Sequence, residues 1–94
     1  MPNPSKIKGS SFERKVVKVL LANGHYAKKV PLSGAAEGYK ADIHINVRGE
    51  VKQIECKKRK HGFKQLYDWL SDNYALVIEQ DRQEPLIIIR LKDY

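Results

Sequence analysis

Residues 41–57 decide the fold, and they read ADIHINVRGEVKQIECK. Two short apolar-rich runs flank a turn at residues 48–50, and this pattern predicts a β-hairpin. Successive side chains of a strand point to opposite faces, so Glu55 and Lys57 should share one face. Asp42 can reach the same point from the neighbouring strand. The sequence therefore predicts two carboxylates and an ammonium group together at one end of the hairpin.

The rest of the chain predicts a single α/β domain over residues 1–94, in which residues 1–9 form a basic flexible arm. Apolar spacing and turn residues place the remaining elements as helices at 10–23 and 63–72, strands at 25–31, 74–78 and 86–89, and a glycine-rich loop at 32–39. The order is helix, three strands, helix, two strands, with the hairpin of residues 40–58 supplying the second and third strands. This order indicates a mixed five-stranded sheet flanked by helices.

Composition points to an anionic partner. The 94 residues carry 18 Lys and Arg against 11 Asp and Glu, a net charge of +7, and nucleic acid is the commonest partner of so basic a protein. Cys56 is the only cysteine, which excludes an internal disulfide and a cysteine metal cage. There is no apolar run of the ~20 residues that a membrane span needs, and residues 1–9 do not read as a secretory signal. We therefore expect a cytoplasmic protein, in the host cytoplasm if its source is a virus.

Five short motifs follow one another along the chain. They are Lys8-Gly9, Glu13-Arg14 on the first helix, Ser33-Gly34 in the loop, Asp42 opening a strand, and Glu55-x-Lys57 on the next strand. In this order and spacing they resemble the PD-(D/E)xK nuclease superfamily, and are most similar to the archaeal-type Holliday junction resolvases. The resemblance covers residues 6 to 60. It departs at Ala41, where a proline usually precedes the aspartate, and in the short region after residue 60.

The resemblance implies a restriction-endonuclease-like fold and a metal-dependent endonuclease. Asp42 and Glu55 offer the carboxylate oxygens that Mg²⁺, or Mn²⁺ in its place, prefers. The resemblance further implies a metal ligand in the Cys56 backbone carbonyl and a catalytic role for Glu13 on the metal, directly or through water. The alternative for Glu13 is an acid in the first turn of its helix, stabilised by the helix dipole.

Two further catalytic residues are expected beside these carboxylates. Lys57 would stabilise the charge that develops on the attacked phosphate, although it also begins a basic run and could simply be solvated. Ser33 is assigned to substrate positioning by the resemblance alone. Eight basic residues are candidates for contacts with the DNA backbone, which give affinity without reading sequence: Lys6, Lys8, Arg14, Lys28, Lys29, Lys58, Arg59 and Lys60.

A four-way junction has near two-fold symmetry and its resolution needs two matched cuts, so a chain with one site should act as a homodimer. The strand at 86–89 lacks alternation and should be covered on both faces, while Trp69 is most simply a core residue. Together they also offer more apolar surface than so small a core needs, which makes them a candidate dimer interface. Two alternatives stay open: a small phage-type nicking or flap nuclease similar to the VRR domains, and an inactive basic DNA-binding module.

Overall fold

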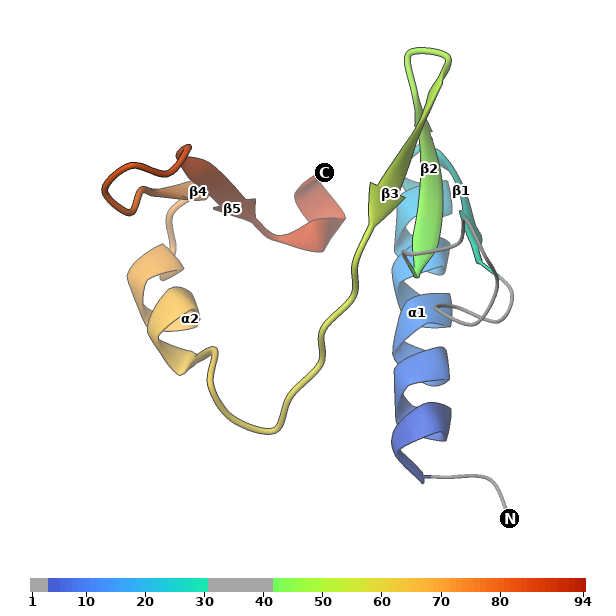
Figure 1. Ribbon diagram of the computed structural model, residues 1–94, viewed down its shortest axis with the longest axis horizontal. Helices are drawn as coiled ribbons and strands as arrows, with labels where there is room; N and C mark the ends of the chain where they lie inside the picture. Colours follow the sequence, from blue (N-terminus) through green and yellow to red (C-terminus); the bar gives the residue numbers. More distant parts are fainter. Residues whose placement is uncertain (1–3, 31–41) are drawn as a thin grey trace. The chain divides into compact units, whose positions relative to one another are not determined.

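The computed structural model describes residues 4–30 and 42–94, with side chains described from residue 11 onward in the first of these ranges. The element order is the one expected: α1 (Pro4–Ala22), β1 (Tyr26–Lys29), β2 (Ile43–Val47), β3 (Glu50–Ile54), α2 (Lys64–Leu70), β4 (Ala75–Ile78), β5 (Leu86–Ile89) and a short 3₁₀ helix, η1 (Leu91–Asp93) (Figure 1). The chain divides into two compact units, Met1–Lys58 and Arg59–Tyr94.

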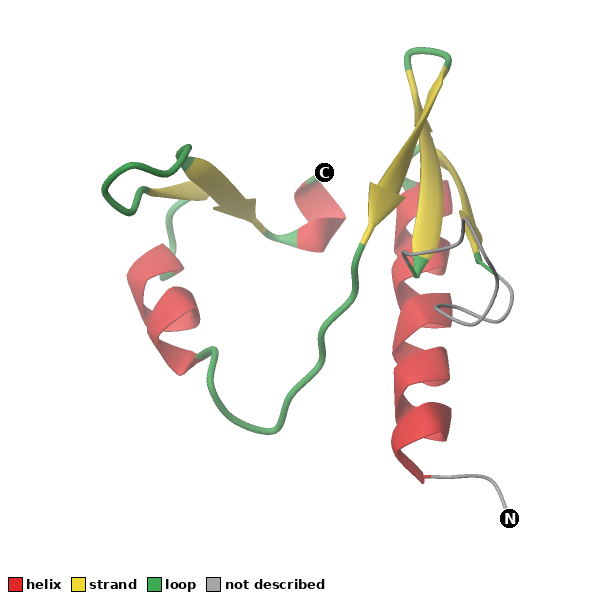
Figure 2. Ribbon diagram, in the orientation of Figure 1, coloured by secondary structure: helices red, strands yellow, loops and turns green. Residues whose placement is uncertain are grey.

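The first unit packs α1 against an antiparallel sheet of order β1-β2-β3 (Figure 2). Val16 and Leu20 lie one turn apart on α1, so they present one apolar face to the sheet. That face meets alternate residues of the strands, which point to the same side of the sheet. The resulting buried cluster consists of Val16, Leu20, Ala27, Ile43 and Ile45. This core fixes α1 against β1 and β2, and with them the side chains described in the next subsection.

The predicted hairpin of β2 and β3 is confirmed, with Val47 paired to Glu50 across the turn. Both turn residues have positive φ, 54° at Arg48 and 83° at Gly49, as a two-residue turn of the primed type requires. The Asn46 side chain closes the turn, because its Oδ1 accepts the Gly49 N–H at 2.9 Å. The turn fixes the register that brings Asp42 opposite the end of β3.

The start of the chain differs from the expectation. The helix begins at Pro4, not at residue 10, so residues 4–9, expected in a flexible arm, are helical. Proline is well suited to the first turn of a helix, where its missing N–H needs no partner. The Asn23-Gly24 pair ends α1 as expected, with Gly24 at a φ of 89°.

The five strands do not form one sheet among the described residues. They form two antiparallel sheets, one of three strands and one in which β4 pairs with β5. The expected cover on both faces of β5 is also wrong, since Ile87 is 66% exposed. Within its unit this hairpin is contacted by α2 through β4. Trp69, expected in the core, is 55% exposed, and Leu70 is the residue of α2 that is buried.

Arg90 ties the second unit together. Its guanidinium group donates hydrogen bonds to the carbonyl oxygens of Ser71 and Asn73, just after α2. The end of β5 is thereby joined to the end of α2. Among the helices that the structure describes, none has the length and apolar character required to cross a membrane.

Candidate active site

Asp42 lies at the edge of the first unit's sheet where β1 and β3 end and β2 begins. Its backbone N–H donates to the Ile54 carbonyl at 3.1 Å, and its carbonyl accepts the Val30 N–H at 2.9 Å. Its carboxylate Oδ2 accepts the backbone N–H of Cys56 at 2.8 Å. This last bond shows that Asp42 does reach the segment of residues 55–57 from the neighbouring strand, as the hairpin pattern predicts.

Glu13 brings a second carboxylate to the same place from α1. Its side chain is only 13% exposed and lies against Asp42 and the ammonium group of Lys29, whose Nζ is 3.7 Å from Glu13 Oε2. The pKa of Glu13 is raised, first because burial disfavours its anion and then because Asp42 is negative, while Lys29 acts in the opposite direction. Since α1 begins at Pro4, Glu13 is not in its first turn, and the alternative of a dipole-stabilised first-turn acid is wrong.

Glu55 and Lys57 lie just past the end of β3 and are paired, with Lys57 Nζ 3.3 Å from Glu55 Oε1. They therefore share one side of the chain, as alternation predicts, although the strand itself stops at Ile54. Both side chains are exposed, and an ion pair of this kind contributes little to stability. Because this ion pair is exposed and weak, both side chains can rotate toward a substrate or a cation.

The surroundings of Cys56 combine the edge of the core with nearby acidic side chains. The thiol packs at the edge of the core, and its pKa is raised to about 11, first by burial and then by the negative charges of Asp42, Glu13 and Glu55. All three acidic groups thus lie within electrostatic reach of one sulfur atom. The side chain of Cys56 thus packs inward, against the core.

A second Glu-x-Lys motif on the same hairpin provides an internal comparison. Glu50 and Lys52 form a shorter ion pair than Glu55 and Lys57, with 2.8 Å between Nζ and Oε2. That pair is exposed at the turn end of β3, while the pair at 55–57 brackets the residue that Asp42 binds. Position relative to Asp42 therefore separates the candidate site from a surface ion pair of the same composition.

The donor set fits a divalent cation. Glu13 and Asp42 are two carboxylates held side by side, and the pKa of Glu13 is raised first by burial and then by the negative charge of Asp42, so a cation bound here would stabilise both anions. Glu55 is turned to Lys57, so in the parts of the chain that the structure covers no three His, Cys, Asp or Glu side chains are gathered as metal ligands. The Glu13 and Asp42 carboxylates therefore lie close together, while Glu55, the third acidic candidate, is paired with Lys57.

The basic candidates divide by environment. Arg14, Lys28 and Lys60 are exposed, and Lys29 is engaged by Glu13. Lys58 and Arg59 each lie near an aromatic ring, with Lys58 Nζ 5.8 Å from the centroid of Phe12 and the Arg59 guanidinium 5.9 Å from that of Phe63. Three further candidates have no described side chain: Ser33 lies outside the described residues, and Lys6 and Lys8 are described only as backbone of α1.

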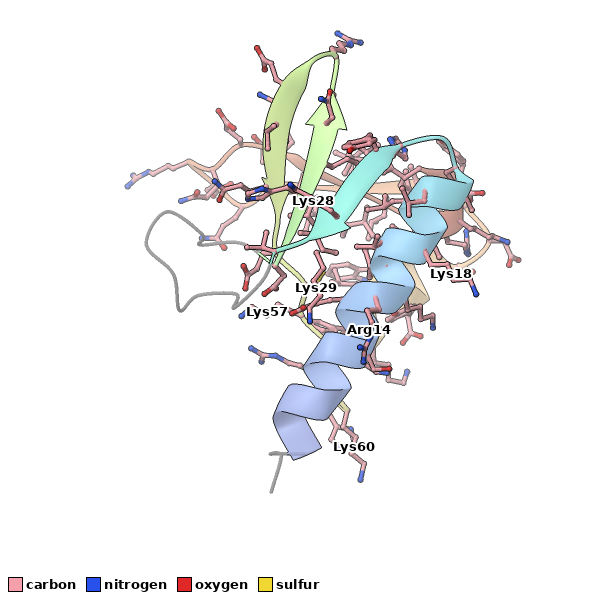
Figure 3. All side chains as sticks on the ribbon, turned by 90° about the vertical axis from the view of Figure 1, so that its right-hand side faces the viewer. Arg14, Lys18, Lys28, Lys29, Lys57 and Lys60 are labelled. Carbon is pink, nitrogen blue, oxygen red and sulfur yellow. The ribbon has the colours of Figure 1, made fainter. Side chains whose placement is uncertain are left out.

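The sequence reasoning missed two basic residues on α1. Lys15 and Lys18 are exposed, and Lys18 lies one turn after Arg14, as Figure 3 shows (Figure 3). Helical periodicity could have found them, because they lie on the face of α1 opposite Val16 and Leu20.

The strand-end aspartate, the Glu-x-Lys segment and the helical glutamate together are the features of a PD-(D/E)xK nuclease. The chain belongs to the archaeal Holliday junction resolvase (Hjc) family, whose model matches residues 4–92. Comparison with curated proteins and with solved structures gave no match. Membership places the chain among nucleases that act on DNA junctions in recombination and repair.

Proposed function

We propose that this chain is a divalent-metal-dependent DNA endonuclease that resolves four-way junctions by paired cuts, acting as a homodimer. One observation carries the proposal beyond family membership. The carboxylate of Glu13, from α1, lies against that of Asp42, which also accepts the backbone N–H of Cys56, the residue between Glu55 and Lys57. A cluster of acidic side chains is unexpected in a chain of net charge +7. A divalent cation that binds both the carboxylates and a phosphodiester would account for it.

The cation is Mg²⁺, with Mn²⁺ as a substitute. Its ligands would be the carboxylates of Asp42 and Glu55 and the backbone carbonyl of Cys56, with Glu13 binding directly or through water. When bound, such an ion makes water a better nucleophile at neutral pH and offsets negative charge on the phosphate. Asp42 is the anchor of this set, since its backbone and one carboxylate oxygen are already held by hydrogen bonds.

Lys57 supplies positive charge from the chain itself. Its ammonium group stands beside Glu55, at the edge of the carboxylate cluster, where it can stabilise the charge that develops on the attacked phosphate. Ser33 positions the substrate. The DNA backbone is held by basic residues of the chain, among which Arg14 on α1 and Lys28 on β1 are exposed.

The assembly follows from the substrate. A junction has near two-fold symmetry and one chain has one site, so two chains supply the matched cuts. We further propose that the chain acts as a single nuclease domain of the restriction-endonuclease-like class, and that it works in the cytoplasm.

The test is cleavage of labelled substrates by the purified chain. A four-way junction, a flap, a linear duplex and a single strand of matched sequence are each incubated with Mg²⁺ and with chelator. The proposal predicts symmetric cuts in the junction with Mg²⁺ and none with chelator. Preferred cutting of the flap would favour the alternative nicking nuclease. Binding of the junction without cleavage of any substrate would favour the inactive binding module.

A further inference from the structure

Among the side chains that the structure describes, Lys29 forms an ion pair with Glu13, the largely buried carboxylate of the candidate site. It is the last residue of β1, its Nζ lies 3.7 Å from Glu13 Oε2, and its side chain is 36% exposed. Lys28, the preceding residue, is exposed and points to the other face of the strand. The two lysines are thus neighbours on one strand, but Lys29 faces Glu13 and Lys28 faces away from it.

Glu13 requires a positive partner. It is nearly buried, and its other polar neighbour is Asp42, a second carboxylate. Asp42 receives a hydrogen bond from the Cys56 amide, which is a neutral donor and does not cancel its charge. Two anions that share a partly buried site repel each other unless a cation stands beside them. Lys29 is the group that the structure places there.

We propose that Lys29 is the internal counter-ion of the Glu13–Asp42 carboxylate pair and that it competes with the divalent cation for these oxygens. The competition rests on the function proposed above, because it concerns the same cation. Both cations seek the same negative charge, and binding of one weakens binding of the other by an equal factor. Lys29 thereby keeps the metal-free site folded and sets the cation concentration at which the site fills.

The first experiment measures melting temperature in chelator, without DNA. Lys29→Met is compared with Lys28→Met, which removes the same charge from the same strand, and with Lys29→Arg, which keeps the charge. We expect Lys29→Met to melt several degrees below Lys28→Met, and Lys29→Arg to melt near the wild-type chain. Equal melting of Lys29→Met and Lys28→Met would overturn the counter-ion role.

A double variant tests whether the effect passes through Glu13. In the Glu13→Gln background one charge of the pair is gone, so Lys29→Met should lower the melting temperature much less than it does in the wild-type background. The same loss in both backgrounds would contradict the proposal and would indicate that Lys29 stabilises the chain through packing of its stem.

The second experiment titrates each protein with Mg²⁺ and follows the rise in melting temperature. Without its competitor the site should fill at a lower Mg²⁺ concentration, by about three- to fivefold for a partly exposed pair. Lys28→Met should keep the wild-type midpoint. An unchanged midpoint for Lys29→Met, or a wild-type chain that Mg²⁺ does not stabilise, would overturn the competition. Neither result bears on whether the chain cuts a junction, which the cleavage assay decides separately.

Discussion

At the scale of single residues, the two Glu-x-Lys motifs along residues 50–57 differ in their position relative to Asp42. Glu50 and Lys52 form a closer pair than Glu55 and Lys57, yet Asp42 binds the backbone between the latter two. Ion-pair distance alone would favour the first motif. The contact of Asp42 with Cys56 favours the second one as the candidate site.

Lys57 and Lys52 should therefore differ in their effect on cleavage. Lys57→Ala removes the positive charge beside the carboxylate cluster and should lower the rate of junction cleavage by about 10²-fold, the usual magnitude for loss of one electrostatic contact to a transition state. Lys52→Ala removes an equivalent surface pair and should leave the rate nearly unchanged. Single-turnover cleavage of a labelled junction measures both. Equal rates for the two variants would remove Lys57 from the site.

Cys56 reports the electrostatics of the cluster through its reactivity. Its pKa is raised from 9.0 to about 11, so the folded chain disfavours the thiolate. The stabilisation that this neutral thiol gives is fully present below pH 9.0 and is lost as the pH rises through about 11. In chelator, we expect the rate of Cys56 alkylation by iodoacetamide to rise at a higher pH in the folded chain than in the chain unfolded in urea. Coincident profiles would show that neither burial nor the carboxylates raise the pKa of the thiol.

At the scale of elements, the hairpin was predictable and the sheet was not. Alternation in β2 and the Arg48-Gly49 turn are local signals, and they correctly predicted the pairing that brings Asp42 to Cys56. The start of α1 lacks such a signal, because Pro4 is compatible with both an extended arm and a first helical turn. How five strands divide between sheets depends on long-range packing, which short apolar runs do not encode.

The motif order indicated Glu13, Asp42, Glu55 and Lys57 as site residues, and their roles stay predictions. The structure places Glu13 against Asp42 and Asp42 against the Cys56 backbone, and pairs Glu55 with Lys57. The contact between Lys29 and Glu13 was not predictable, because it joins β1 to α1 across the core edge and no spacing in the sequence encodes it. Lys29 was accordingly assigned to DNA with the other basic residues.

The turn between β2 and β3 allows a test at the scale of the element. Gly49 has a φ of 83°, where a Cβ is strained, so Gly49→Ala should lower the free energy of unfolding by about 1 kcal/mol. Arg48 has a φ of 54°, a conformation that asparagine tolerates better, so Arg48→Asn should raise it by up to about 1 kcal/mol. Urea denaturation measures both changes. Changes of the same sign would contradict the turn geometry.

At the scale of the whole molecule, exposed apolar side chains gather on the second unit, on α2, β4 and β5, and include Trp69, Val77, Leu86 and Ile87. Exposed apolar area of this kind marks interaction surfaces in soluble proteins. It is therefore the surface we propose for the homodimer, as the sequence also suggested.

Ile87→Lys tests the dimer, with Val51→Lys as its control, because the two side chains are almost equally exposed at 66% and 65% and Val51 lies on β3. We expect Ile87→Lys to shift the sedimentation profile from dimer toward monomer and to change paired cuts in a junction into single nicks. Val51→Lys should keep both properties of the wild-type chain. A wild-type chain that sediments as a monomer at all concentrations would refute the homodimer.

We propose that the carboxylates around Asp42 bind the cation that is needed to cut a DNA junction. To test this, one labelled four-way junction is incubated with Mg²⁺ and either the wild-type chain or Asp42→Asn, a variant that can still accept the Cys56 N–H but has lost its charge. We expect paired, symmetric cuts by the wild-type chain and no detectable product from Asp42→Asn, although both proteins bind the junction. Cleavage by Asp42→Asn at the wild-type rate would contradict it.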